Sequence, residues 1–558
     1  MVSLISESVE VRVDQIAAGY TRVYEKDHYL LLGWNDNIFD IIAELQEAGR
    51  VSNRRHTKIV VLSDLEKKKM DELIMQRVDF GDKQHKLQVI CRQGDPTSVV
   101  AQRRVGAGDA GRIVILAQRP EVASSDLSDN LALNTLLVTR QLGSKVPVII
   151  ESRTKDGRHM FSRKSLFGSA DRNVVILSWR EIVGRLGVIL ARAPPGIDRV
   201  FDQLMTFDDD EIYVRSYREL AGSTIAQASQ AIQNAIILGV VEGGMPGKVQ
   251  LNPYPHYVLQ SMDELVLLAD NADIVLSRDQ VDLVQDPSVR RQAKPDTLQR
   301  ASRKEHILIV GWRGGMDDIL RQIDAPARRG TRVTILAGAS VAEREALLRG
   351  ETGDLIGYKN ISVRHVVGSP LDATALARAA RTGPTSILLL MRDRTEDLVI
   401  DEVTRSLDAV ALSTLVLLRA ALPHGCTPRV VVEVMDPNSA ALVKSASPHA
   451  EAVSRQGIFA KLTAQATENP LVARVWEILL SQDHENIVFM PLSSILPPHA
   501  GSHPLSFRQL TALAWQRHCS LMGLIRTDGS LDLNPLDKDA PIEFEKVQSL
   551  VVIAKLSY

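Results

Sequence analysis

The chain has 558 residues, too many for one hydrophobic core, because such cores stop growing at about 250–300 residues. It contains 66 lysines and arginines against 68 aspartates and glutamates, with 45% hydrophobic residues, which excludes a disordered chain and a strongly basic nucleic-acid surface. The cysteines Cys91, Cys426 and Cys519 lie far apart, so neither a disulfide framework nor a zinc site is expected, and a reducing cytoplasm is the simplest setting.

Membrane insertion and export are not expected from this sequence. No stretch reaches the roughly 18–20 consecutive apolar residues that a membrane span requires. The start, MVSLISESVEVRVDQ, lacks a cationic segment followed by an apolar core.

The first apolar segment, HYLLLGW at residues 28–34, recurs as HILIVGW at residues 306–312. Further matches keep nearly the same spacing along the chain; they pair Gly94 with Gly368, Glu151 with Glu433, and Asn252 with Asn534. Such a steady register over some two hundred residues indicates an internal duplication with short loop insertions.

Each half begins with short, β-branched apolar runs that alternate with helical patterns. Examples are TKIVVLSD, RIVILA and VPVIIE in the first half and TRVTILAG, SILLLM and PRVVVEV in the second. Apolar side chains recur at helical spacing after the first run of each half, at Ile38, Ile41, Ile42 and Leu45 and at Met316, Ile319, Leu320 and Ile323. This alternation predicts a parallel sheet with helices on both faces.

Later in each half the pattern changes to helices near residues 178–206 and 457–482, followed by short strands such as DEIYVRSY and ENIVFMPL. We therefore predict an α/β fold with two tandem units, each a doubly wound, Rossmann-like lobe plus a smaller α+β lobe. The predicted divisions are a leading segment at 1–27, a first unit at 28–276, a polar linker at 277–304 and a second unit at 305–558.

A dinucleotide-binding turn needs three glycines, in the pattern G-x-G-x-x-G, and only the first is kept here, as Gly33 and Gly311. The later positions hold Asn35 and Ile38 in the first half, and Arg313 and Met316 in the second. A standard pyrophosphate site is therefore not expected in either half. The tryptophan after each glycine, Trp34 or Trp312, is instead expected to pack into the strand–helix corner.

Several residues near these turns are still candidates for ligand contact. Asp36 can cap the helix in the place of a phosphate. Asp64 lies where a ribose-binding acid would, although a surface aspartate opening a loop is the commoner explanation. Gly94 and Asp95 follow the third strand region. Arg313 could hold a phosphate or a carboxylate, or it could be solvated.

The acidic run Asp208, Asp209 and Asp210 supplies oxygen ligands of the type that calcium prefers, with a solvated acidic turn as the alternative. No G-x-S-x-G, H-E-x-x-H or G-K-[ST] motif occurs in the chain. We therefore expect no enzymatic activity, and we expect His28 and His306 to be structural.

The segments HYLLLGWND, VICRQGDP, SDNLALNTLLVTRQL and HILIVGWRGGMDDIL resemble the cytosolic part of the Castor/Pollux family of ion channels. That resemblance covers nearly the whole chain and implies tandem RCK (regulator of potassium conductance) domains in a homotetrameric gating ring at the cytoplasmic face of a membrane. It also implies a membrane pore domain as partner and a potassium-type cation as the conducted ion. Residues 1–27 resemble the connector from the pore, and Asp129 and Asp408 match a shared acid.

Three functions are considered from this sequence. A ligand-sensing gating ring is favoured, with calcium as the candidate ligand and NAD or an adenine nucleotide as the less favoured one. The alternative is a soluble nucleotide-binding regulatory subunit of a separate ion transporter. A nicotinamide-dependent oxidoreductase rests on analogy of fold alone.

Overall fold

The computed structural model describes residues 19–555 except 53, 81–84, 119–124, 155–156, 158–159, 162–172, 208, 278–303, 349–356, 393–399 and 497–503. Nearly all of the expected linker at 277–304 and most of the leading segment at 1–27 lie outside the described residues. None of the described helices is both long and apolar enough to cross a bilayer.

The first half opens with a six-stranded parallel sheet in the order β3-β2-β1-β4-β5-β6. Its strands are β1 (Tyr29–Leu32), β2 (His56–Ser63), β3 (Lys86–Gln93), β4 (Arg112–Ile115), β5 (Val148–Glu151) and β6 (Val174–Leu177). The helices between them are α2 (Ile38–Val51), α3 (Lys67–Arg77), α4 (Val99–Arg104) and α5 (Ser125–Gln141). β1 is fully buried, as a strand covered on both faces should be.

The second half repeats this sheet in the order β13-β12-β11-β14-β15-β16. Its strands are β11 (His306–Val310), β12 (Thr331–Ala337), β13 (Ile361–Val367), β14 (Ser386–Leu389), β15 (Arg429–Val434) and β16 (Ala450–Ser454). The helices are α11 (Met316–Asp324), α12 (Val341–Leu347), α13 (Ala373–Ala380), α14 (Ile400–Ala421) and α15 (Ser439–Ala446). The predicted apolar stripes of α2 and α11 are buried in full.

Each half also carries a small lobe built on a four-stranded antiparallel sheet. The first contains β7 (Glu211–Arg215), α10 (Ile225–Ala231), β8 (Ala235–Val241), β9 (Val249–Leu251) and β10 (Glu264–Ala269). The second contains β17 (Glu485–Met490), α18 (Phe507–Gln516), β19 (Cys519–Arg526), β20 (Leu531–Leu533) and β22 (Val547–Lys555), with the short pair β18 (Leu505–Ser506) and β21 (Pro541–Ile542) beside it. The predicted α/β class with two tandem units is thus confirmed.

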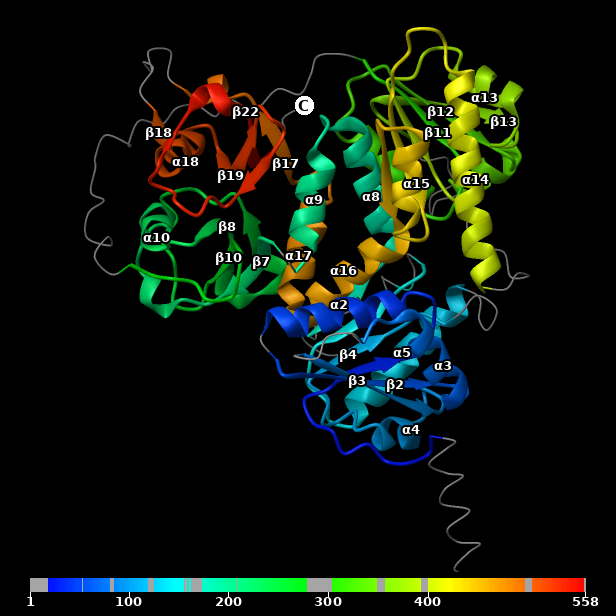
Figure 1. Cartoon of the computed structure of the whole chain (residues 1–558), viewed down its shortest axis with the longest axis vertical. Helices are drawn as coiled ribbons and strands as arrows, with labels where there is room; N and C mark the ends of the chain where they lie inside the picture. Colours follow the sequence, from blue (N-terminus) through cyan, green and yellow to red (C-terminus); the bar gives the residue numbers. More distant parts are fainter. Residues whose placement is uncertain are drawn as a thin grey trace, which may run out of the picture.

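The helices that link the large and small lobes lie between the two halves (Figure 1). They are α8 (Trp179–Arg192) and α9 (Ile197–Met205) from the first half, and α16 (Arg455–Glu468) and α17 (Pro470–Leu479) from the second. α8 packs against α11, β14 and β15 of the second half, whereas α16 packs against α2, β4 and β5 of the first. Helix α8 of the first half packs on the second half, and α16 of the second half packs on the first. One large hydrophobic core cluster therefore contains residues of both halves.

The two small lobes meet through a reciprocal pair of hydrogen bonds. The Asn252 side chain donates to the carbonyl of His518, just before β19, at 2.6 Å. Its counterpart Asn534 donates to the carbonyl of Asn234, just before β8, at 3.1 Å. Both asparagines have positive φ, of 51° and 42°, a backbone region that asparagine tolerates better than most residues. Equivalent asparagines of the two repeats thus make equivalent bonds, which relates the two small lobes by an approximate twofold symmetry.

Candidate ligand-binding turns

The turn after β1 is closed by a polar cluster beneath the start of α2. Asn35 donates from Nδ2 to the Ala117 carbonyl at 2.9 Å and to Oε2 of Glu151 at 2.6 Å. Asn37 donates to the other carboxylate oxygen of Glu151 at 3.1 Å. A Cβ on Gly33, whose φ is +106°, would lie 2.9 Å from the Leu116 carbonyl oxygen, so this position requires glycine.

Trp34 belongs to the hydrophobic core, with only 2% of its surface exposed. Its ring meets that of Phe39 edge to face, at 5.6 Å between centroids. Trp312 in the second half is only partly buried and lies 6.4 Å from the ring of His365. The first-half tryptophan thus packs in the strand–helix corner more completely than its repeat.

The turn after β11 holds a buried ion-pair cluster in the equivalent place. Arg313 donates from Nε to Glu433 at 3.1 Å, and Arg455 donates from Nη2 to the other carboxylate oxygen at 2.9 Å. Both guanidinium groups stack on Trp179, at 5.3 and 3.8 Å from its ring centroid. Trp179 and Arg455 come from the two exchanged helices, so this cluster depends on the contact between the halves.

The two equivalent glutamates differ in their proton affinity. Burial raises the pKa of Glu151, and the charge of Arg153 and the hydrogen bonds from Asn35 and Ala117 offset this only in part. Burial alone would likewise raise the pKa of Glu433, but Arg313 and Arg455 outweigh it, and the pKa is lowered. Glu433 is therefore held as a carboxylate, whereas Glu151 favours its neutral form more than an exposed glutamate does.

A pocket of ≈ 900 Å³ opens at the second turn, lined among others by Gly311–Asp317, Ala337–Ala339, Gly368–Pro370 and Arg392. These segments follow the carboxyl ends of β11, β12, β13 and β14, where ligands bind in open parallel sheets. The N-terminus of α11 begins at this pocket, after Gly315 in the left-handed conformation. The broken glycine fingerprint did not predict a pocket here.

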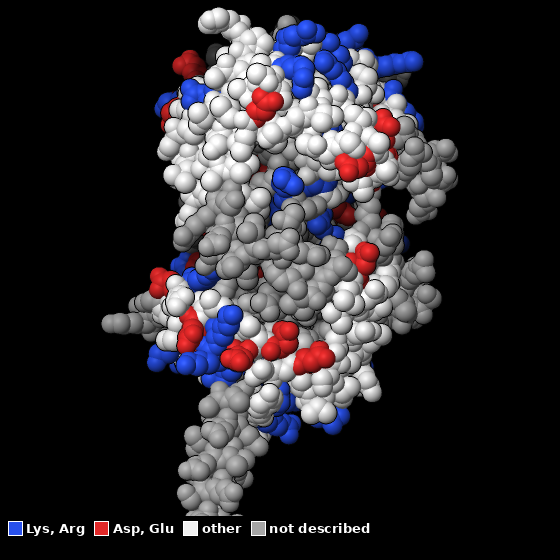
Figure 2. Space-filling view, turned by 90° about the vertical axis from the view of Figure 1, so that its right-hand side faces the viewer, with Lys and Arg blue, Asp and Glu red and all other residues white. Residues whose placement is uncertain are grey.

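The pocket wall holds two arginines, Arg313 and Arg392, and one acid, Asp317, and a third arginine lies close by. Arg344, on α12, is fully buried and donates to the backbone carbonyls of Ile335, Ala337, Ala339 and Val366. Its guanidinium lies 5.9 Å from the centroid of the Trp312 ring, which lines the pocket. Figure 2 also shows basic side chains gathered over one end of this face, where the second large lobe lies. Because Arg313 is already paired with Glu433, the exposed Arg392 is the candidate contact for an anionic ligand on this wall.

The other nucleotide candidates of the first half lie apart from one another. Asp36 is half-buried in the turn before α2. Asp64 is exposed after β2, and its carboxylate accepts a hydrogen bond from Ser63 at 3.0 Å. Gly94 packs closely under α4, since a Cβ there would lie 3.2 Å from that of Ala101. The exposed Asp95 accepts hydrogen bonds from Thr97, so it shapes the turn before α4.

The candidate calcium residues divide between solvent and the lobe interface. Asp208 lies outside the described residues, and Asp209 is exposed. Asp210 is buried and accepts a hydrogen bond from Asn534 of the second small lobe at 2.8 Å. Within the described ranges, no group of three or more histidine, cysteine, aspartate or glutamate side chains could hold a metal ion.

Equivalent aspartates of the two halves hold the loops that follow β5 and β15. Asp129 accepts hydrogen bonds from the Arg153 and Thr154 amides after β5, and Asp408 accepts them from Met435 and Asp436 after β15. His306 contacts the Thr334 hydroxyl at 3.0 Å, and burial lowers the pKa of its ring. Glu151 and Glu433 were matched by the repeat but were not predicted to lie in the turns, because nothing local distinguishes them from strand-end acids.

The tandem arrangement of this chain matches the fold of a known gating ring. The human SLO3 gating ring superimposes with a TM-score of 0.62 over 95% of this chain and 100% of that one, at 13% sequence identity. This similarity establishes the fold.

Sequence comparison identifies the family that the chain resembles. The model for "Castor and Pollux, part of voltage-gated ion channel" matches residues 180–285. The ion channel CASTOR of Lotus japonicus is 28% identical over 75% of this chain and 46% of its own length. The probable ion channel POLLUX of Oryza sativa subsp. japonica is 24% identical over 100% of this chain and 58% of its own length. The predicted resemblance to Castor/Pollux ion channels is confirmed, and the chain spans about half the length of these relatives.

Proposed function

We propose that this chain is the cytosolic gating-ring part of a Castor/Pollux-like cation channel, in which ligand binding is coupled to pore opening. The observation that carries the proposal is the full-length match to a gating-ring fold together with the similarity to Castor/Pollux channels. The exchanged helices α8 and α16 support it, because their packing offers a physical route between the turns of the two halves.

The proposed assembly is a homotetramer that joins a membrane pore domain at the cytoplasmic face, with a potassium-type cation as the conducted ion. Cyclic symmetry would place eight RCK-like units in one ring. Residues 1–27 would connect the ring to the pore. Their described part runs beside α4, where the Val23 amide donates to the Arg104 carbonyl at 2.8 Å.

Two ligands are proposed. Calcium is proposed for the run Asp208, Asp209 and Asp210 because three carboxylates follow one another in the sequence, although Asp210 accepts a hydrogen bond from Asn534. An anionic ligand such as NAD or an adenine nucleotide is proposed for the pocket at Gly311, because its size and the exposed Arg392 on its wall suit one. A ligand acts as a switch only if it binds one ring shape more tightly than the other.

A thermal-shift screen tests the ligands, since binding to the folded state raises stability by RT ln(1 + [L]/Kd). Calcium, NAD(H) and ADP should be compared on the wild type, on an Asp209→Asn variant and on an Arg392→Glu variant. We expect the first substitution to reduce the calcium shift and the second to reduce the nucleotide shift. If a ligand raises the melting temperature of the wild type and of the matching variant equally, the ligand does not bind at that site.

Recording from a chimera tests the coupling to a pore. The chain should be joined to the pore segment of a Castor relative and studied in planar bilayers with each ligand on the side of the chain. We expect ligand-dependent open probability. Ligand binding without any change in open probability would favour the alternative, a soluble nucleotide-binding regulatory subunit of a separate transporter.

A further inference from the structure

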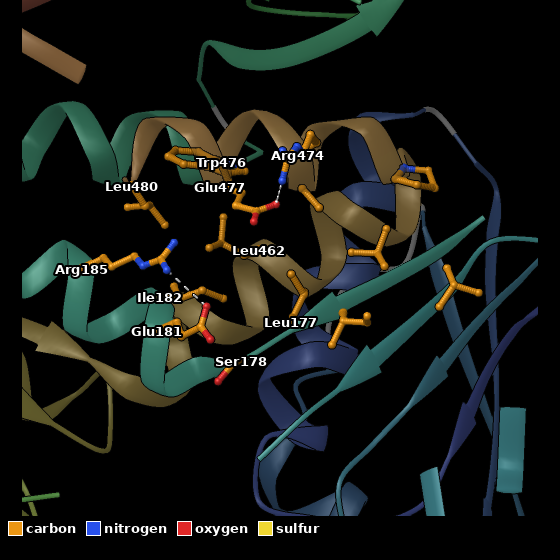
Figure 3. A pocket seen from close by; sticks show the side chains of 15 residues that line it. Leu177, Ser178, Glu181, Ile182, Arg185, Leu462, Arg474, Trp476, Glu477 and Leu480 are labelled. Carbon is orange, nitrogen blue, oxygen red and sulfur yellow. Dashed lines mark hydrogen bonds and ion pairs between the residues drawn. The ribbon is translucent and has the colours of Figure 1, made fainter. Parts of the chain in front are cut away.

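A second pocket, of ≈ 340 Å³, lies at the junction of the two halves. One wall is β6 and the start of α8, from the first half, and the other is α16 and α17, from the second (Figure 3). Its described lining residues all differ from those of the pocket at Gly311, so this junction pocket is a separate candidate site.

Apolar side chains from both halves line the junction pocket. They are Leu177 and Ile182 from the first half and Leu462, Trp476 and Leu480 from the second (Figure 3). The Trp476 ring is held in place, because its indole N–H donates to Gln465 at 2.7 Å. Pockets of about this size with apolar walls and a few converging polar groups are typical of small-molecule sites.

The charged side chains of the described lining balance one another. They are two acids, Glu181 and Glu477, and two arginines, Arg185 and Arg474. Arg185 lies 3.5 Å from Glu181 and also donates to Asp318 at 3.0 and 3.1 Å, and Arg474 pairs with Glu477. A charged ligand would lose its hydration without gaining a free counter-charge here, so these walls favour an uncharged ligand.

The free edge of β6 supplies both hydrogen-bond donors and acceptors to this pocket. β6 is the last strand of its sheet, and the carbonyls of Asn173 and Leu177 accept bonds from β5 and the residue after it. Because backbone direction alternates along a strand, the N–H and C=O groups of Val174 and Ile176 point away from β5, and both residues line the pocket. In the part of the chain that the structure describes, no other backbone group bonds to them.

This arrangement of donors and acceptors is complementary to one residue of an extended peptide. Such a residue directs its own N–H and C=O to the same side, so it can donate to and accept from a strand edge at once. Val174, Val175 and Ile176 are only half-buried, which leaves the edge open to a ligand. A ligand that pairs these backbone groups gains more than one that covers them without hydrogen bonds.

We propose that the junction pocket binds a small, uncharged, peptide-like ligand: an apolar amino-acid unit that is acylated at its nitrogen and amidated at its carboxyl group. Its N–H and C=O pair with the edge of β6 as an added strand does, and its apolar side chain packs between β6 and α17. Since both halves contribute walls, the bound ligand stabilises the relative position of the halves that forms this pocket.

Titration calorimetry of the full chain with N-acetyl-leucine methylamide tests the proposal. The matched ligands are the ester analogue, in which an oxygen replaces the leucine N–H, and free leucine, which is charged at both ends. We expect saturable binding of the diamide, with the ester weaker by about tenfold because one β6 carbonyl loses its donor, and free leucine weaker still. Absence of diamide binding, or an ester or free leucine that binds as tightly, overturns the proposal.

Variants locate the site. Ala473→Trp, on the α17 wall, should fill the pocket and abolish diamide binding, whereas the same substitution at the exposed Ala377 of α13 is the matched control and should bind as the wild type does. Glu477→Gln should change the affinity by no more than about twofold, because the ligand carries no charge. Circular dichroism checks that each variant is folded. If folded Ala473→Trp binds the diamide normally, or folded Glu477→Gln does not bind it, the proposal fails.

Discussion

At the scale of single residues, one acid of the ancestral repeat has two different electrostatic settings. Glu151 receives neutral donors, from Asn35, Asn37 and the Ala117 amide, whereas Glu433 receives two guanidinium groups. Both carboxyl groups bond to side chains of the turn that precedes the first helix of their half, Glu151 to Asn35 and Asn37 and Glu433 to Arg313. The two halves therefore share the backbone of this turn but differ in the charge of the groups that contact its glutamate.

Substitution of these glutamates should separate the two settings. Glu433→Gln leaves Arg313 and Arg455 buried without a full counter-charge, and we expect a loss of about 3–5 kcal/mol in the free energy of unfolding. Glu151→Gln keeps a neutral acceptor and should cost about 1 kcal/mol. Urea denaturation of both variants measures this, and equal losses would contradict the assignment.

The tryptophans of the two turns give a second residue-scale test. Trp34→Ala removes a fully packed indole, and we expect a loss of about 3–5 kcal/mol. Trp312→Ala should cost less, because that ring is only partly buried. Melting temperatures of both variants, with NAD titrated in parallel, check this. Unchanged melting of Trp34→Ala together with lost NAD binding would assign Trp34 to a ligand site instead.

How far the sequence predicts these sites depends on the range of the interactions. Gly33, Gly311 and the buried face of α2 follow from local pattern, because turn geometry and helical spacing are local properties. The pairing of Arg313 with Glu433 does not, since the two residues are 120 positions apart and Arg313 was equally compatible with a phosphate or solvent. Arg455 and Trp179 give no local signal, because they reach the turn only through helices exchanged between the halves.

At the scale of elements, the exchange of α8 and α16 is the main departure from two self-contained units. The sequence predicted helices near 178–206 and 457–482, but amphipathic spacing does not say which sheet a helix will cover. The exchange is possible because small residues line the contact. A Cβ on Gly184 of α8 would lie 3.0 Å from Cγ1 of Ile319 on α11.

A larger side chain at Gly184 should weaken the packing between the two halves and lower the stability of the fold. Gly184→Leu forces side-chain atoms into α11 and beside Arg313, and we expect a loss of about 1–3 kcal/mol from overpacking. Gly247→Leu, where nothing lies within 4 Å of the added Cβ, is the control. Chemical denaturation distinguishes them, and equal stability of the two variants would contradict close packing at α8.

Strand β7 carries a pH-dependent group. Burial raises the pKa of Glu211 from 4.5 to about 8, and its carboxyl accepts a hydrogen bond from Tyr213 at 3.0 Å. The folded state thus binds this proton more tightly than the unfolded chain, so the stability that the proton contributes is complete below about pH 4.5 and is lost as the pH rises toward 8.

Glu211→Gln should remove this dependence. Between pH 5 and 8 the wild type should lose up to about 1.4 kcal/mol per pH unit more than the variant. Urea denaturation across that range measures the difference. Parallel curves for the two proteins would show that Glu211 titrates normally.

At the scale of the whole molecule, the shared core and the reciprocal bonds of Asn252 and Asn534 make the two units one folded body. The duplication and the Castor/Pollux resemblance predicted the two units, but not the packing that joins them into one body. The exposed surfaces through which copies would join are not predictable from the pattern of one chain, because the rims of interfaces resemble ordinary surface. Assembly of four chains into a ring is therefore tested on the purified protein.

The most direct test is the mass and symmetry of the purified chain. Light scattering at high protein concentration should give about four times the chain mass of 61.5 kDa, and electron microscopy of that species should show a closed fourfold ring of eight similar units. A protein that remains strictly monomeric at high concentration would contradict the gating-ring account.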